Sequence, residues 1–130
     1  HNRILVEGGV PISAGENLHT IYDFQHMLQA NGVSFIEPDV SNCGGITVWM
    51  KVAKLAEAKN LPVTSHGVHD IHVHLLGAVP NASYLEVHGF GLERFILEPL
   101  VVKDGFALAG EAPGHGIDFN WDGLCAHTSD

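Results

Sequence analysis

Basic residues are scarce in this sequence. Lysine and arginine together number 6, against 15 aspartates and glutamates, and the formal net charge is −9. A protein that binds nucleic acid or an anionic membrane needs basic side chains to neutralise phosphates, so the charge balance argues against both classes of partner. The chain also has no apolar run approaching the roughly 20 residues that cross a bilayer. We therefore expect neither a nucleic acid nor a membrane as a partner.

Cysteine is equally sparse, and Cys43 and Cys125 are its two occurrences. Two thiols so far apart along the chain do not suggest a disulfide framework or a cysteine metal cluster. Free thiols are typical of reducing compartments, so we expect a cytoplasmic protein.

What the sequence does contain is a recurring short apolar run that ends on an ionisable residue. These runs occupy residues 11–16, 33–39, 61–66 and 82–86. Their last residues are Glu16, Asp39, His66 and Glu86. The spacing of roughly 20–27 residues is the length of one strand-loop-helix-loop unit. Because the carboxyl ends of parallel strands carry the chemistry in α/β sheets and barrels, we predict that these side chains share one edge.

Amphipathic helices are predicted between the apolar runs. Residues 46–60 place Val48, Val52 and Leu55 on one stripe with a period of about 3.6. Residues 18–30 and 70–79 follow the same pattern, and a Gly or Pro comes shortly after each of them. The predicted fold class is therefore α/β with parallel strands.

The length of 130 residues fits one domain but only half of an eightfold barrel, which typically needs roughly 250 residues. The chain opens at His1 without a methionine. We therefore expect a fragment of a longer enzyme, with a whole protein built on an open four-stranded sheet as the alternative. From residue 97 the pattern changes to short strands around a turn at 103–105. This change predicts a division into βα units at 1–96 and a β-meander segment at 97–130.

Each strand-end residue has a chemical and a structural interpretation. Glu16 offers a hard oxygen ligand suited to Mg²⁺, or an acid that interacts with the dipole of the following helix. Asp39 could orient His66 as a general base, or it could cap the turn that follows it. Glu86 could be a neutral acid that donates to a developing oxyanion, or the partner of a nearby Arg or His. The residues alone leave these alternatives open.

Histidines crowd one stretch, at His66, His69, His72 and His74. A zinc site among them is conceivable, since histidine is a common zinc ligand. However, His74 would point away from His72 on a helix, and neither an HExxH pattern nor paired cysteines support the idea. We therefore do not assign zinc to this run.

The motifs of this chain resemble the mandelate racemase branch of the enolase superfamily. The matching segments are AGEN at 14–17, EPD at 37–39, NCGGIT at 42–47, TSHG at 64–67, YLE at 84–86 and PGHGI at 113–117. They stand in order over about residues 9–122. Within the branch, residues 15–20 and 65–72 are most similar to acid-sugar dehydratases of the talarate/galactarate type.

The resemblance implies the C-terminal part of a (β/α)8-type barrel with Mg²⁺ as its cofactor. It implies that Glu16 is a metal ligand, that Asp39 and His66 form the proton-transfer dyad, and that Glu86 hydrogen-bonds the substrate carboxylate. Absent from this chain are the family's Lys-x-Lys strand, its first two metal ligands and its N-terminal capping domain, on which residues 97–130 would pack. The resemblance also implies a homo-oligomer for the full-length enzyme.

The expected substrate is a small carboxylate, a sugar acid. The loops around His19, His69 and Asp70 are polar, and polar groups in a closed pocket need hydroxyl partners that an aromatic acid lacks. We assign Asn17 and His19 to substrate binding. The expected reaction is dehydration to a 2-keto-3-deoxy acid. The alternatives are a racemase or epimerase of the same branch, or an inactive α/β fragment.

Overall fold

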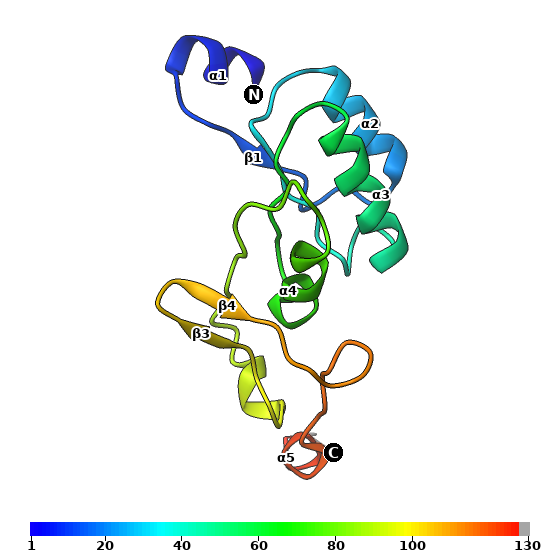
Figure 1. The fold of residues 1–130 in the computed structure, drawn as a ribbon, viewed down its shortest axis with the longest axis vertical. Coiled ribbons are helices and arrows are strands. Elements are labelled where there is room, and N and C mark those ends of the chain that lie inside the picture. The colour runs from blue at the N-terminus through cyan, green and yellow to red at the C-terminus, as the bar shows by residue number, and fades with distance from the viewer. Residues whose placement is uncertain (128–130) are drawn as a thin grey trace.

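The computed structural model describes residues 1–127 (Figure 1). In chain order the elements are α1 (Asn2–Gly8), β1 (Ser13–Ala14), α2 (Ile21–Gln29), β2 (Phe35–Ile36), α3 (Ile46–Glu57), α4 (His69–Gly77), the 3-10 helix η1 (Leu92–Phe95), β3 (Val101–Lys103), β4 (Phe106–Leu108) and α5 (Trp121–Cys125). The first part of the chain alternates strands and helices, as the apolar runs predict. The last part carries an antiparallel hairpin and a short helix.

Parallel pairing joins the four predicted strand segments in chain order. β1 pairs with β2, and single bridges then join Ile36 to Val63 and Val63 to Ala82, all of them parallel. The α/β class with successive parallel strands is thus confirmed. The regular pairing is shorter than the apolar runs, since Pro38 and Pro62 lack the N–H group that a ladder hydrogen bond requires.

The helix boundaries differ from the predicted ones by at most three residues. α2 begins at Ile21 rather than at residue 18 because Thr20 caps it: the Thr20 hydroxyl accepts from Asp23 N at 3.3 Å, and the Asp23 carboxylate accepts from Thr20 N at 3.0 Å. α3 begins at Ile46, as predicted, and ends at Glu57, whereas the prediction extended to residue 60. The left-handed backbone of Asn60, at φ 55°, belongs to the turn that follows the helix.

The core lies between the parallel strands and the helices. Phe24 of α2, Trp49 of α3 and Ile36 of β2 are fully buried, and α2 and α3 lie side by side (Figure 1). Burial of side chains of this size contributes about 1.5–3 kcal/mol each. The Trp49 indole also donates to the carbonyl of Pro38 at 3.1 Å. This hydrogen bond anchors the backbone immediately before Asp39.

The C-terminal segment folds as a hairpin followed by a short helix. β3 and β4 are antiparallel, and the turn between them runs through Asp104 and Gly105, both with positive φ. This is the turn that the sequence predicts. α5 was not predicted; the side chain of Asn120 caps it by accepting from Gly123 N. The division of the chain at residue 96 stays a prediction.

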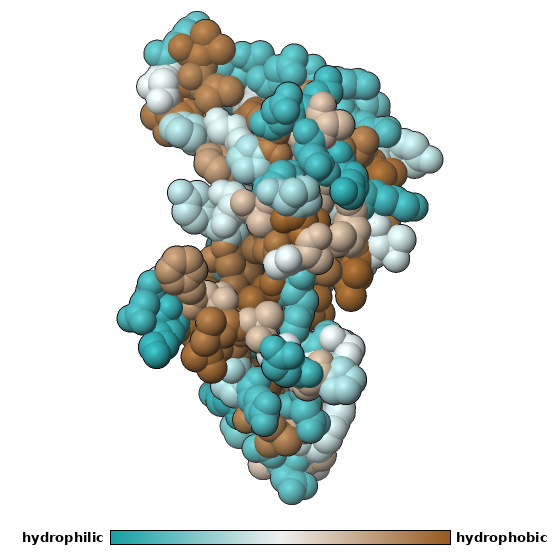
Figure 2. Space-filling view, viewed as in Figure 1, coloured by the Kyte–Doolittle hydropathy of each residue, from teal (hydrophilic) through white to brown (hydrophobic). Residues whose placement is uncertain are grey.

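Part of the molecular surface is apolar. Figure 2 shows apolar surface spread over the middle of the view. Tyr84 is 72% exposed, although it directly precedes the strand-end pair Leu85 and Glu86. Among residues 1–127, no helix has both the length and the apolar character to cross a membrane.

Candidate active site

The four strand-end residues lie at one edge of the parallel segments. His66, at the end of the segment that passes through Val63, lies at the centre of the group. Its Nε2 atom is 3.1 Å from Glu16 Oε2, and its Nδ1 atom is 3.2 Å from Asp39 Oδ2. The His66 side chain is 28% exposed, so a small molecule can reach it. The structure thus places this imidazole between two carboxylates that come from different strands.

The surroundings of His66 favour its charged form. Burial by itself disfavours the imidazolium, but the hydrogen bond with Asp39 and the negative charges of Glu86 and Glu16 outweigh it and raise the pKa of His66. An imidazole with a raised pKa is a stronger base. Because Asp39 faces Nδ1, the proton on that nitrogen is fixed and Nε2 is the nitrogen that exchanges protons.

Asp39 combines the two interpretations that the sequence left open. One carboxylate oxygen, Oδ1, accepts from Ser41 N at 2.8 Å and from the Ser41 hydroxyl at 2.6 Å, as a turn cap does. The other oxygen, Oδ2, faces His66. Burial raises the pKa of Asp39, but the hydrogen bonds from Ser41 and His66 outweigh burial and lower it overall. The carboxylate therefore stays ionised, and the cap holds it in place against the imidazole.

Two neighbours shape the space around Asp39. Gly67 has φ +81°, and a Cβ atom at this position would overlap the Asp39 carboxylate. His72 is fully buried: its Nδ1 donates to Val68 O at 2.8 Å, and its Nε2 accepts from Val40 N at 3.1 Å. Burial lowers the pKa of His72 and keeps it neutral. His72 is thus a structural histidine with both nitrogens occupied, and it joins no zinc site.

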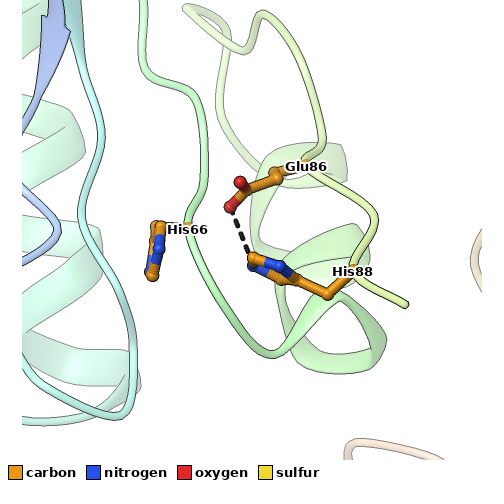
Figure 3. A group of neighbouring side chains, drawn as sticks. All are labelled: His66, Glu86 and His88. Carbon is orange, nitrogen blue, oxygen red and sulfur yellow. Dashed lines mark ion pairs between the residues drawn. The ribbon is translucent and has the colours of Figure 1, made fainter. Parts of the chain in front are cut away.

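Glu86 pairs with a histidine that the sequence reasoning missed. Glu86 Oε2 lies 2.9 Å from His88 Nε2 (Figure 3). The amide of Gly67 donates to His88 Nε2 at 2.9 Å and is 3.4 Å from Glu86 Oε2. The Glu86 amide in turn donates to the hydroxyl of Ser65. Residues two apart on an extended segment share a side, so the Glu86-x-His88 spacing was the signal that could have found this partner.

Glu16 lies outside the first turn of α2. α2 begins five residues later and is capped by Thr20. Glu16 Oε1 accepts from the Asn17 side chain at 3.0 Å, and its carbonyl accepts from the Asn42 side chain at 3.1 Å. The two candidate substrate contacts, Asn17 and His19, are both exposed beside it. A half-exposed carboxylate oxygen fits Mg²⁺ as one ligand, and the ion would need further oxygens besides.

A comparison with known protein families assigns the chain to one of them. The family described as enolase C-terminal domain-like matches residues 1–123. The chain belongs to this family. This enolase-like chain therefore carries a part of a (β/α)8-type barrel, and the predicted superfamily and fold are confirmed.

Individual relatives carry more specific names. The chain is 51% identical, over 122 residues, to 3,6-anhydro-alpha-L-galactonate cycloisomerase from Streptomyces coelicolor, covering 94% of this chain and 34% of the relative. It superposes with a TM-score of 0.90 on the crystal structure of a racemase from Streptomyces coelicolor A3(2) with bound magnesium, at 47% identity, covering 96% of this chain and 34% of that one.

A third relative is the L-talarate dehydratase from Polaromonas sp. JS666, solved with Mg and L-glucarate. The TM-score is 0.88 at 29% identity, and the match covers 99% of this enolase-like chain and 36% of that one. Magnesium is therefore confirmed as the cofactor of the family. The chain spans about a third of the length of the relatives that it matches.

Proposed function

We propose that this chain supplies one part of the active site of a magnesium-dependent enzyme that removes the proton alpha to the carboxylate of a sugar acid. The resulting enediolate then expels its beta hydroxyl, which takes a proton and leaves as water. The enol that remains gains a proton at the beta carbon and becomes a 2-keto-3-deoxy acid. The observation that carries the proposal is the position of His66, with Asp39 on Nδ1 and Nε2 directed at the Glu16 carboxylate. The remaining part of the barrel would supply the other groups that the reaction needs.

His66 would act as the base at the alpha carbon. The buried Asp39 keeps the proton of the neutral imidazole on Nδ1, which leaves the Nε2 lone pair for the substrate proton. When Nε2 takes that proton, the imidazolium is stabilised by the charge of Asp39. The same nitrogen can return the proton to the departing beta oxygen, if both groups lie on one face of the substrate.

Glu86 would stabilise the negative charge that develops on the substrate carboxylate. Glu86 Oε2 lies 2.9 Å from His88 Nε2, the nitrogen that accepts from the Gly67 amide and therefore has no proton to donate to Glu86. In its neutral form the Glu86 carboxyl group can donate to an oxyanion. Glu86 is 38% exposed, so it is accessible to a ligand at the strand ends.

Glu16 would hold the magnesium ion. A divalent ion at this position, when bound, neutralises the second negative charge that forms as the alpha proton leaves. Asn17 fixes one Glu16 oxygen, so the carboxylate is oriented before an ion arrives. His19 and Asn17 are exposed polar groups beside it and would hydrogen-bond the hydroxyls of a sugar acid.

The relatives favour two further fates for the same enediolate. In an anhydro sugar acid the beta oxygen belongs to a ring ether, so its expulsion opens the ring and releases no water. The 51% identity to a cycloisomerase named for such a substrate favours this second candidate. Return of a proton to the alpha carbon would instead give racemisation, the alternative that the sequence leaves open. All three reactions share the first step at His66.

A substrate panel tests the proposal. The full-length protein is incubated with magnesium and with aldonic, aldaric and 3,6-anhydro sugar acids, and 2-keto-3-deoxy acid formation is measured. We expect product from at least one of them in the wild type and in the His26→Asn control, an exposed histidine of α2, but none in His66→Asn. If no sugar acid reacts while mandelate-like acids exchange their alpha proton in heavy water, the elimination assignment is wrong and racemisation replaces it. A homo-oligomer and a cytoplasmic location remain predictions.

A further inference from the structure

Three side chains at the strand ends form a cluster in which two of the three donor atoms are imidazole nitrogens, whereas magnesium prefers oxygens. His66, Glu86 and His88 each offer one ligand atom, and these atoms lie within 4.8 Å of one another (Figure 3). We propose that this cluster is a second metal site, selective for Zn²⁺ or a similar transition metal, and that a metal bound there switches the enzyme off. The inhibition rests on the proposed function, whereas the binding does not.

The donor set distinguishes the two metals. Two imidazole nitrogens and one carboxylate are a common zinc set, and a fourth position remains for water. Magnesium instead takes hard oxygens in near-octahedral geometry and keeps several waters. Divalent transition metals also bind imidazole more tightly than magnesium does. The His66–Glu86–His88 cluster therefore favours zinc even where magnesium is abundant.

Only small movements would close the cluster around an ion. Zinc bonds of 2.0–2.1 Å place tetrahedral ligands about 3.3 Å apart, so the widest pair, within 4.8 Å, would close by at most about 1.5 Å. Glu86 and His88 are already 2.9 Å apart. The rings of His66 and His88 meet edge to face, with their centroids 5.2 Å apart.

Contacts behind the ligands already orient them. Asp39 on Nδ1 of His66 makes the carboxylate–histidine arrangement that supports zinc ligands, and the Ser41 cap fixes this Asp39. The His88 ring stacks on Phe90, with centroids 4.2 Å apart and planes 13° apart. The Gly67 amide, 2.9 Å from His88 Nε2, is also 3.4 Å from Glu86 Oε2 and can donate there once Nε2 binds a metal.

The site is also accessible and negatively charged. All three ligands are partly buried, and a cavity of about 200 Å³ adjoins His66 and His88, which leaves room for the water on the open position. Glu16 lies against His66 Nε2 at 3.1 Å and adds negative charge. That contact must give way when the nitrogen binds zinc.

Bound zinc would remove both acid-base groups at once. The ion occupies the lone pair of His66 that would accept the alpha proton, and the Glu86 oxygen that would face the substrate carboxylate. We therefore expect zinc inhibition that added magnesium does not relieve, because the two ions use different ligands. The inhibition should be competitive with the substrate.

Direct metal binding tests the site. Zinc affinity is measured against a chromophoric chelator in the full-length protein with saturating magnesium, and Co²⁺ replaces zinc to report a tetrahedral absorption band. His88→Gln and Glu86→Gln should each lower zinc affinity by about tenfold or more and weaken the cobalt band. The control His26→Gln, on the exposed surface of α2, should leave both unchanged.

Three outcomes would overturn the inference. The first is a zinc affinity that is unchanged in both His88→Gln and Glu86→Gln. The second is displacement of bound zinc by magnesium. The third is a zinc affinity that is lost in Glu16→Gln but retained in His88→Gln, because this result would place the zinc ion on the magnesium ligand. Circular dichroism identifies a variant that has unfolded. In that case the zinc affinity of the other variant and the cobalt band of the wild type decide whether the site exists. Zinc binding without turnover of any sugar acid would refute the proposed function alone. Turnover without zinc binding would refute this inference alone.

Discussion

Replacing Gly67 with alanine is a sharp test of how the dyad is held. Gly67 follows His66 directly and has φ +81°, a left-handed conformation. A Cβ atom built there overlaps Asp39 Oδ2, the oxygen that faces His66 Nδ1. The carboxylate cannot swing away freely, because Ser41 holds its other oxygen with two hydrogen bonds. Either the Gly67 backbone or the Asp39–His66 contact must therefore give way.

The effect of each change on stability or on rate can be estimated. A side chain in the left-handed region costs about 1–2 kcal/mol, which lowers the free energy of unfolding by that amount. If Asp39 moves instead, His66 loses the group that orients it, and a positioned general base contributes about 10²–10⁴-fold to a rate. We expect Gly67→Ala to lower kcat by about 100-fold or more, with only a modest loss of stability.

Steady-state kinetics and thermal unfolding separate the two effects. The matched control is Gly77→Ala at the end of α4, where a Cβ atom meets nothing within 4 Å. This control should keep full activity and gain up to about 1 kcal/mol of stability, since alanine is the better helix residue. If Gly67→Ala kept both the wild-type kcat and the wild-type stability, neither the backbone nor the Asp39–His66 contact would have yielded, and the reasoning would be refuted. If it kept kcat but lost about 1–2 kcal/mol of stability, the backbone would have yielded and the expected loss of kcat would be wrong.

Three further predictions concern single groups. Asp39→Asn should lower kcat by about 10²–10⁴-fold, measured by product formation; an unaffected rate would leave Asp39 as a turn cap only. Glu16→Gln should weaken magnesium binding in titration calorimetry, with the rate partly restored at high magnesium; unchanged affinity would exclude Glu16 as a ligand. Burial lowers the pKa of His72, so the unfolded chain binds the proton more readily and the free energy of unfolding should fall as pH drops below about 6.5. Denaturation with urea at several pH values checks this, and a His72 ring that titrates normally in the folded protein would contradict it.

The sequence predicted well which residues gather at the strand ends. Packing alone does not explain why an apolar run should end in an ionisable group, so such a group marks the end of a strand at a functional edge. Glu16, Asp39 and His66 do come together, with His66 in contact with both carboxylates. The α/β class follows from the same pattern, and the parallel bridges confirm it.

Other features depend on contacts that a linear pattern does not contain. Asp39 both caps the following turn and contacts His66, and the sequence could not predict this combination. Either role alone is enough to explain an aspartate at that position. The start of α2 depends on the reciprocal bonds of Thr20 and Asp23, whereas apolar periodicity alone extends the helix towards Leu18. The Glu86–His88 contact depends on the course of the chain beyond Glu86, where the apolar run has ended and no pattern predicts how the backbone continues.

The central claim is that His66 removes the proton alpha to a carboxylate. Proton NMR in heavy water, with magnesium and a sugar acid that the full-length protein consumes, follows the alpha proton directly. We predict that the signal is lost with the wild type and persists with His66→Asn, while calorimetry gives nearly the same magnesium affinity for both proteins. Loss of the alpha proton at the wild-type rate in His66→Asn, or a product that retains this proton, would contradict the account.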